Sequence, residues 1–133
     1  MERANNNQSV VIDPSVNEIT KTVIGCAYSV SNSLGCGFLE KVYENAMVHE
    51  LAKHSLKVDR QHKIKIKYDG VVIGDYIADL VIEDSVLVEI KNVDRLGTPQ
   101  VAQCLNYLKA TGIHIGLLMN FGRPRVEVKR LIL

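Results

Sequence analysis

At the centre of this sequence stands Ile77-Ala78-Asp79-Leu80-Val81-Ile82-Glu83-Asp84-Ser85-Val86-Leu87-Val88-Glu89-Ile90-Lys91. Two apolar segments flank a short polar turn at Glu83-Asp84-Ser85, which is the pattern of a β-hairpin. A hairpin centred on Asp84 places Asp79 directly across from Glu89, with their Cβ atoms about 5 Å apart. Lys91 lies two residues beyond Glu89 and therefore points to the same face.

Three charged side chains in an apolar hairpin require a physical explanation. Facing carboxylates repel, and a buried charge costs on the order of several kcal/mol unless it is paired or bound to metal. A hard divalent cation would offset both effects, because Mg²⁺ is bound through one or two carboxylates together with waters and phosphates. In the alternative, Lys91 forms an ion pair with one carboxylate at a solvated end of the sheet. Spacing alone leaves both interpretations open.

Asp79 followed by Glu89-Ile90-Lys91 resembles the PD-(D/E)XK nuclease core, in which an acid ends one strand and acid-x-Lys lies on the next. Ala78 stands where the PD motif has proline. The whole chain is more specifically similar to the GxxExxY family of that superfamily. The naming motif stands here as Gly37-Phe38-Leu39-Glu40-Lys41-Val42-Tyr43. Further matching segments are Arg60-Gln61, Gly74-Asp75-Tyr76-Ile77-Ala78-Asp79, Gln103, Tyr107-Leu108-Lys109-Ala110-Thr111-Gly112 and Asn120-Phe121-Gly122.

The resemblance implies metal-dependent hydrolysis of phosphodiester bonds in nucleic acid, with DNA expected over RNA. Asp79, Glu89 and the carbonyl of Ile90 would bind Mg²⁺ or Mn²⁺. Lys91 would orient the attacking water and stabilise the transition state.

Two predicted helices are expected to contribute further residues. Glu40 reads on its own as a first-turn acid favoured by the helix dipole. The resemblance implies that it completes the acidic cluster as a further metal ligand, directly or through water. Tyr43 either holds that carboxylate or packs against the sheet. Gln103 reads on its own as an exposed polar residue, whereas the resemblance implies that it bonds the attacking water or a phosphate.

Two other functions remain open at the level of sequence. One is a non-catalytic adaptor that binds nucleic acid or protein, keeps the nuclease fold and has no divalent-metal site. The other is an enzyme that hydrolyses a small phosphate ester and leaves polymers intact. The presence together of Asp79, Glu89 and Lys91 favours an enzyme over an adaptor.

The rest of the chain predicts the order helix, helix, strand, strand, strand, helix, strand, strand. This order gives an α/β class with a mixed sheet flanked by helices, in agreement with the single restriction-endonuclease-like domain over residues 14–133 that the resemblance implies. Residues 1–13 are polar and are expected to form a flexible tail. Ser15 is the predicted N-cap of a helix over 16–32, and a second helix is predicted over 39–53.

The second half of the chain carries clear start and stop signals. Asp69-Gly70 predicts a hairpin turn. Thr98 with Pro99 at the first helical position predicts a helix that ends at Gly112. The apolar run over 113–120 follows that helix, so we expect a buried strand parallel to a central one.

Three lysines, Lys63, Lys65 and Lys67, alternate with apolar residues in the predicted strand before Asp69-Gly70. Such a row is either a solvated strand face or a set of phosphate contacts. Tyr107, on the third predicted helix, is a further candidate nucleic-acid contact.

Composition narrows the setting of the chain. No apolar run reaches the length of a membrane span. Three cysteines without CxxC spacing indicate free thiols in a reducing cytoplasm. The net charge of +1 gives no general affinity for nucleic acid, so a substrate surface has to come from local clustering. So small a core is expected to draw on a homodimer or a partner protein to recognise its substrate.

Overall fold

The structure, a computed structural model, describes residues 11–133. Of the expected tail, residues 1–10 lie outside the described residues. The predicted order of helices and strands is confirmed. The elements are α1 (Pro14–Leu34), α2 (Glu40–Ala52), β1 (Val58–Tyr68), β2 (Val71–Ile82), β3 (Val86–Lys91), α3 (Thr98–Thr111), β4 (Ile115–Asn120) and β5 (Glu127–Ile132).

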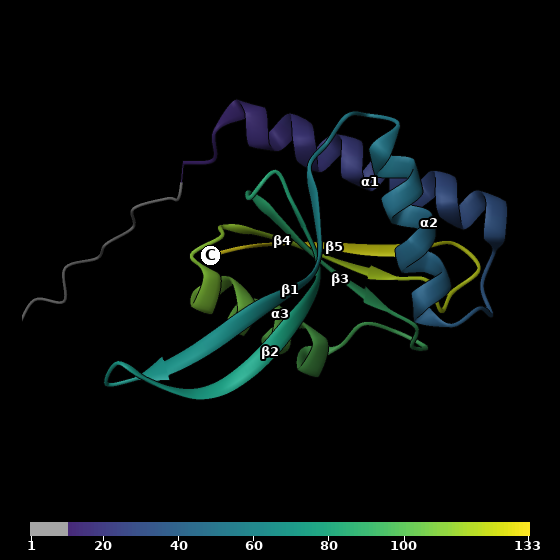
Figure 1. The fold of residues 1–133 in the computed structure, drawn as a ribbon. Helices are drawn as coiled ribbons and strands as arrows, with labels where there is room; N and C mark the ends of the chain where they lie inside the picture. The colour runs from purple at the N-terminus through teal and green to yellow at the C-terminus, as the bar shows by residue number, and fades with distance from the viewer. Residues whose placement is uncertain (1–10) are drawn as a thin grey trace, which may run out of the picture.

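One mixed sheet, with strand order β1-β2-β3-β4-β5, forms the middle of the molecule. Its neighbouring strands are antiparallel except for the parallel pair β3 and β4. Parallel strands require a crossover, which α3 supplies. Helices α1 and α2 cover one face of the sheet and α3 covers the other (Figure 1).

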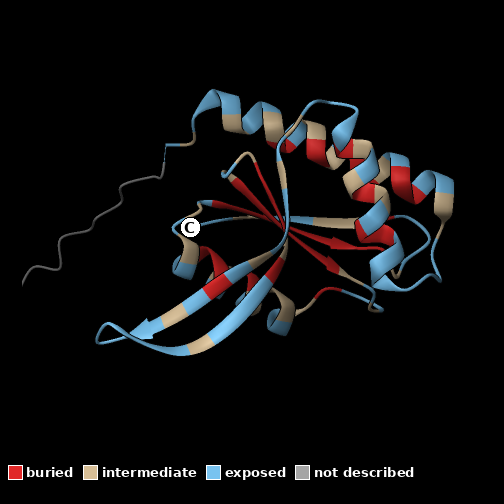
Figure 2. Cartoon of the chain, viewed as in Figure 1, coloured by how far each residue is buried: buried red, intermediate tan, exposed pale blue. Residues whose placement is uncertain are grey.

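Alternation along the strands divides the core into two layers. Leu80 and Ile82 of β2 pack toward α1 and α2, whereas Val81 packs toward α3. Strands β3 and β4 are therefore apolar on both faces, and their buried residues fill the centre of Figure 2. A charged residue in β3 such as Glu89 has no solvated face to turn to, and Asp79 lies beside it at the partly buried edge of β2.

The outer parts of β1 and β2, residues 63–77, extend beyond the sheet as an exposed hairpin, called here the β1–β2 arm (Figures 1 and 2). Its turn is the one predicted, because Asp69 and Gly70 both have positive φ, 48° and 75°, as a two-residue hairpin turn requires. The predicted alternation of lysines with apolar residues is interrupted near the tip. The register shifts between Ile66 and Lys67, and Tyr68 is exposed.

Two predicted helix starts need correction. The N-cap of α1 is Asp13, whose side chain accepts a hydrogen bond from the Ser15 N–H at 2.8 Å, so Ser15 is not the cap. Helix α3 starts one residue early, with Gly97 as N-cap, so that Pro99 is its second residue. The predicted end at Gly112 is confirmed by its left-handed conformation, with φ of 74°.

The cysteines in the described chain, Cys26, Cys36 and Cys104, are free thiols, as expected. Within residues 11–133, none of the helices combines the length and the apolarity that a membrane crossing needs.

Candidate active site

Asp79 and Glu89 meet at the point where the ladder between β2 and β3 ends. The paired residues are Ile82 with Val86, Val81 with Leu87 and Leu80 with Val88, so the hairpin is centred on Asp84 as predicted. One step further, the side chains replace the backbone ladder. The Asp79 N–H donates to Glu89 Oε1 at 3.1 Å, and the Ile90 N–H donates to Asp79 Oδ2 at 2.7 Å.

Burial makes this pair of carboxylates unfavourable in the charged form. Glu89 is only 4% exposed, and burial, followed by the nearby Asp79 carboxylate, raises the pKa of Glu89 to about 8. Burial also raises the pKa of Asp79, against the opposing effect of its hydrogen bond from Ile90. Without a bound metal ion, the carboxylate pair therefore favours a bound proton near neutral pH.

Lys91 provides the cation that lies beside this pair. Its Nζ is 3.8 Å from Glu89 Oε2 and donates a 2.6 Å hydrogen bond to Gln103 Oε1. Gln103 on α3 thus fixes the direction of the lysine side chain. The structure brings Asp79, Glu89, Lys91 and Gln103 together. The ion pair considered for Lys91 is present only as a long contact with Glu89, and the shorter bond of the ammonium group is the one to Gln103.

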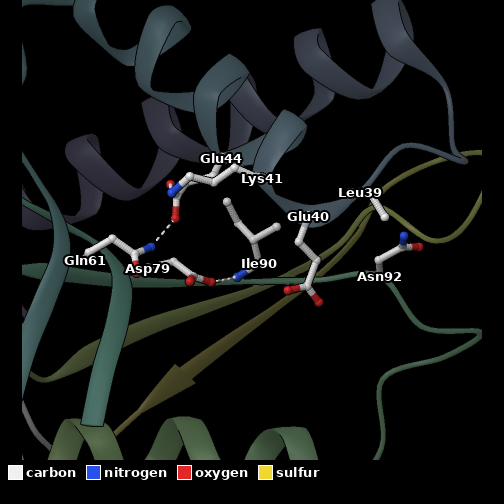
Figure 3. A pocket seen from close by; sticks show the side chains of 8 residues that line it. All are labelled: Leu39, Glu40, Lys41, Glu44, Gln61, Asp79, Ile90 and Asn92. Atoms are coloured by element: carbon white, nitrogen blue, oxygen red, sulfur yellow. Dashed lines mark hydrogen bonds and ion pairs between the residues drawn. The ribbon is translucent and has the colours of Figure 1, made fainter.

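Glu40 opens α2 and reaches the same region from the opposite face of the sheet. It lines an open pocket of about 580 Å³ together with Asp79, Ile90 and Asn92. Its side chain extends from the start of α2 and lies next to Ile90 (Figure 3). Within residues 11–133, no three His, Cys, Asp or Glu side chains are already grouped closely enough to hold a metal ion.

The turn before α2 sets the position of Glu40. Gly37 has φ of 113°, a conformation that L side chains rarely adopt, so glycine is required there. The buried Tyr43 hydroxyl donates to the Gly35 carbonyl at 2.7 Å and accepts from the Phe38 N–H at 3.3 Å. The Tyr43 ring stacks on Phe121 at a centroid distance of 4.6 Å. Of the two roles predicted for Tyr43, packing is the one observed.

Glu44 is a site residue that the sequence reasoning missed. Its side chain is 4% exposed and accepts hydrogen bonds from Lys41 at 2.6 Å, from Arg60 at 2.9 Å and from Gln61. Although burial raises the pKa of Glu44, the bonds from Arg60, Lys41 and Gln61 outweigh it and lower that pKa. Glu44 is thus buried on α2 beside the apolar residues Tyr43, Met47 and Leu51, whereas Leu39, the N-cap of the helix, is 77% exposed.

Gln61 links this cluster to Asp79. The pairs on either side of it place Gln61 opposite Asp79, and Figure 3 shows its side chain beside Asp79 and directed at Glu44. Gln61 has φ of 52°, and such strain in a residue other than glycine is typical of functional sites. The signal in the sequence was the Arg60-Gln61 match, with Glu44 four residues after Glu40 on the same helix.

A latch formed by Asn120 holds the segment after Lys91 in place. The buried Asn120 side chain accepts from the Val93 N–H at 3.0 Å and donates to the Val93 carbonyl at 2.9 Å. Gly122 approaches this segment so closely that an added Cβ would lie 2.4 Å from the Val93 oxygen. Asn92 then donates to the Phe38 carbonyl at 2.9 Å and joins the latch to the start of α2.

A comparison with protein-family models places these features in a known context. A model described as the PD-(D/E)XK nuclease superfamily matches residues 17–131. The chain belongs to the PD-(D/E)XK nuclease superfamily. No curated protein and no solved structure matches the chain.

Membership in the superfamily agrees with the five-stranded mixed sheet and three helices, which form the restriction-endonuclease-like fold. It supports a nuclease-like function and an interaction with nucleic acid. PD-(D/E)XK nucleases typically use divalent metal ions.

The donor set at Asp79 and Glu89 fits a hard divalent ion of the kind that the superfamily uses. Among the described residues, each carboxylate uses one oxygen for a backbone N–H and keeps Asp79 Oδ1 and Glu89 Oε2 outside these bonds. The N–H and C=O of one strand residue point the same way, so the Ile90 carbonyl lies on the Asp79 side of β3. Two carboxylates and a carbonyl suit Mg²⁺ or Mn²⁺, which take oxygen ligands.

The candidate nucleic-acid contacts of this PD-(D/E)XK protein line two neighbouring hollows. Lys65 and Lys67 line a groove between the β1–β2 arm and α3, together with Tyr107. Lys63 lines only a second hollow near the end of α3, which shares Lys65 with the groove. Tyr107 is 5% exposed, so it backs the groove rather than projecting into it.

Proposed function

We propose that this chain is a metal-dependent phosphodiesterase that hydrolyses nucleic acid, with DNA as the expected polymer. The observation that carries the proposal is the meeting of Asp79 and Glu89 at the end of the β2–β3 ladder, with Lys91 beside them. A fold that needed only stability would place apolar residues there, because removal of a buried ionic group in favour of apolar packing is often neutral or stabilising. Superfamily membership supports the nuclease-like part of the proposal.

Each residue has a stated role in the proposed reaction. Asp79, Glu89 and the Ile90 carbonyl would hold Mg²⁺ or Mn²⁺, with Glu40 as a further ligand directly or through water. When bound, such an ion supplies Lewis-acid activation of water and charge stabilisation on the phosphate. Lys91, directed by its bond to Gln103, orients the attacking water and donates to the phosphate as negative charge develops.

We also assign the chain to the GxxExxY family within the superfamily. The support is that the glycine, glutamate and tyrosine of the GxxExxY motif each have a physical role. Gly37 adopts a conformation that only glycine tolerates readily, and Glu40 lines the pocket. Tyr43 holds the turn before α2 through its bond to the Gly35 carbonyl. Gln103, which matches in the same alignment of motifs, holds Lys91.

Cleavage assays on labelled single-stranded and duplex oligonucleotides with Mn²⁺ test this proposal. We expect Asp79→Ala and Lys91→Ala each to lower the cleavage rate by roughly 100-fold or more, since each removes a group that acts at the reacting phosphate. Asp94→Ala is the matched control, because Asp94 is an exposed acid three residues after Lys91 and should leave the rate unchanged. Circular dichroism checks that all three variants are folded.

Three results would overturn the proposal in different ways. Full activity in Asp79→Ala or Lys91→Ala would remove these residues from the chemistry. Hydrolysis of bis(p-nitrophenyl) phosphate without cleavage of any polymer would identify a small phosphate ester as the substrate. Absence of both hydrolysis and metal binding in the wild type would identify a non-catalytic adaptor.

A further inference from the structure

A groove of about 1020 Å³ runs between the β1–β2 arm and α3. Helix α3 lies on the face of the sheet opposite α1 and α2 (Figure 1). Gln103 lines one part of this groove and also accepts the hydrogen bond from Lys91. Gln103 therefore connects the groove to the candidate active site by a hydrogen bond. Its outer wall is an exposed hairpin and its inner wall is a helix.

The charge of the groove is positive, whereas that of the pocket at Asp79 is mainly acidic. Lys65, Lys67 and Lys109 line the groove, and no aspartate or glutamate of the described residues lines it. Among residues 11–133, none of these lysines forms an ion pair, in contrast to Lys41, which is paired with Glu44. Unpaired lysines along a groove suit the phosphates of a polyanion.

An aromatic side chain stands in the same groove. Tyr76 of the arm is 50% exposed, and its ring centroid lies 5.6 Å from that of the buried Tyr107 on α3. Tyr107 thus packs against one side of Tyr76. A ring that is packed on one side and open on the other offers a surface on which a nucleic-acid base can stack.

We propose that this groove binds a single strand of nucleic acid, with Tyr76 stacking on a base and Lys65, Lys67 and Lys109 contacting phosphates. The combination of a basic groove with aromatic rings is the one by which proteins bind single strands without reading sequence. A duplex keeps its bases stacked on one another and would leave Tyr76 without a partner. The proposal rests on the proposed function for the reaction that follows, since the groove leads to Lys91 through Gln103.

Fluorescence anisotropy tests the groove apart from the chemistry. The probes are a labelled oligothymidine of about 12 nucleotides, within the range of site sizes for single strands, and a labelled duplex of the same length. EDTA removes divalent ions and so prevents cleavage, and low salt strengthens the contacts to phosphates. We expect the wild type to bind the single strand more tightly, and Tyr76→Ala to weaken that binding by roughly 5- to 100-fold. Tyr68→Ala is the matched control, because Tyr68 is an exposed tyrosine of the same arm outside the groove.

Two lysine variants distinguish binding in the groove from binding along the row of Lys63, Lys65 and Lys67 on β1. Lys109 belongs to the groove alone, and Lys63 belongs to the row alone. We expect Lys109→Ala to lower the dependence of binding on salt, with a change of about 0.7 in the log–log slope for a single strand, and Lys63→Ala to leave it unchanged.

Several results would overturn the proposal that the groove binds a single strand. These are tighter binding of the duplex, an equal loss in Tyr68→Ala, or a loss in Lys63→Ala without one in Lys109→Ala. Absence of binding to either probe would leave the exposed apolar side chains of the arm, such as Val71 and Ile73, as a protein contact surface instead.

Cleavage assays on the same variants distinguish failure of the groove from failure of the proposed function. Cleavage that depends on Asp79 but is indifferent to Tyr76 and Lys109 would contradict the groove alone. Binding that depends on Tyr76 and Lys109 without any metal-dependent cleavage would contradict the function alone.

Discussion

Asp79 and Glu89 each accept a hydrogen bond from the backbone of the opposite strand, and this exchange holds two carboxylates close together in an apolar sheet. Their proximity could be predicted from the sequence, because the apolar runs around Asp84 are symmetrical and fix the register. The role of Glu44 could not be predicted in the same way. Its partners Arg60 and Gln61 come from another element, and the backbone turns toward it through the positive φ of Gln61.

Glu89 should make the metal-free protein less stable as pH rises. Its pKa is about 8 in the folded state and 4.5 without the influence of the fold. Between these values the folded chain retains a proton that the unfolded chain has lost, so the free energy of unfolding falls from about pH 5 to about pH 8. We expect this loss to reach the order of a few kcal/mol in the wild type and to shrink markedly in Glu89→Gln, which does not titrate.

Urea unfolding in EDTA at the two ends of that pH range measures the difference. The raised pKa of Asp79 acts in the same direction and remains in the variant, so a smaller residual slope is expected there. Equal slopes in wild type and Glu89→Gln would show that Glu89 is not held protonated by burial.

At the scale of elements, the sequence was sufficient for the order of helices and strands and for both hairpin turns. It was less successful at helix ends and faces. The predicted start signals were Ser15 and Thr98, whereas Asp13 and Gly97 are the residues that cap these helices. Each cap lies only one or two residues before the predicted one. The burial of Glu44 on α2 was also missed, because a buried glutamate cannot be recognised before its partners are known.

The latch at Asn120 and Gly122 should be intolerant of an added methyl group. A Cβ at Gly122 would lie 2.4 Å from the Val93 oxygen and 2.7 Å from its nitrogen, both backbone atoms that cannot move aside independently. We expect Gly122→Ala to lower the free energy of unfolding by about 1–3 kcal/mol. It should also reduce cleavage, because the shifted segment begins directly after Lys91.

Gly97→Ala is the matched control for this substitution. Its Cβ would meet no atom closer than 3.6 Å, and its φ of −136° is accessible to alanine. Chemical denaturation should place Gly97→Ala within about 1 kcal/mol of the wild type. A similar loss in both variants, or none in Gly122→Ala, would contradict the close approach described for Gly122.

At the scale of the whole molecule, charge is separated in a way that composition conceals. The net charge of +1 gave no indication of nucleic-acid binding. In the folded chain, acids gather at the pocket of Glu40, Glu44 and Asp79, while unpaired lysines line the groove between α3 and the β1–β2 arm. The groove could not be predicted from the sequence, because Tyr76 and Lys109 come from distant segments that only the extended hairpin brings together.

The central claim is that Asp79 and Glu89 bind a divalent ion for phosphodiester hydrolysis, and calorimetric titration of Mn²⁺ tests it most directly. The titration is made near pH 8, which is close to the pKa of Glu89, with and without a short oligonucleotide, into wild type and Asp79→Ala. We predict about one ion bound per chain in the wild type, strengthened by the oligonucleotide, and loss of that binding in Asp79→Ala. No binding to the wild type under either condition, or equal binding to Asp79→Ala, would contradict the claim.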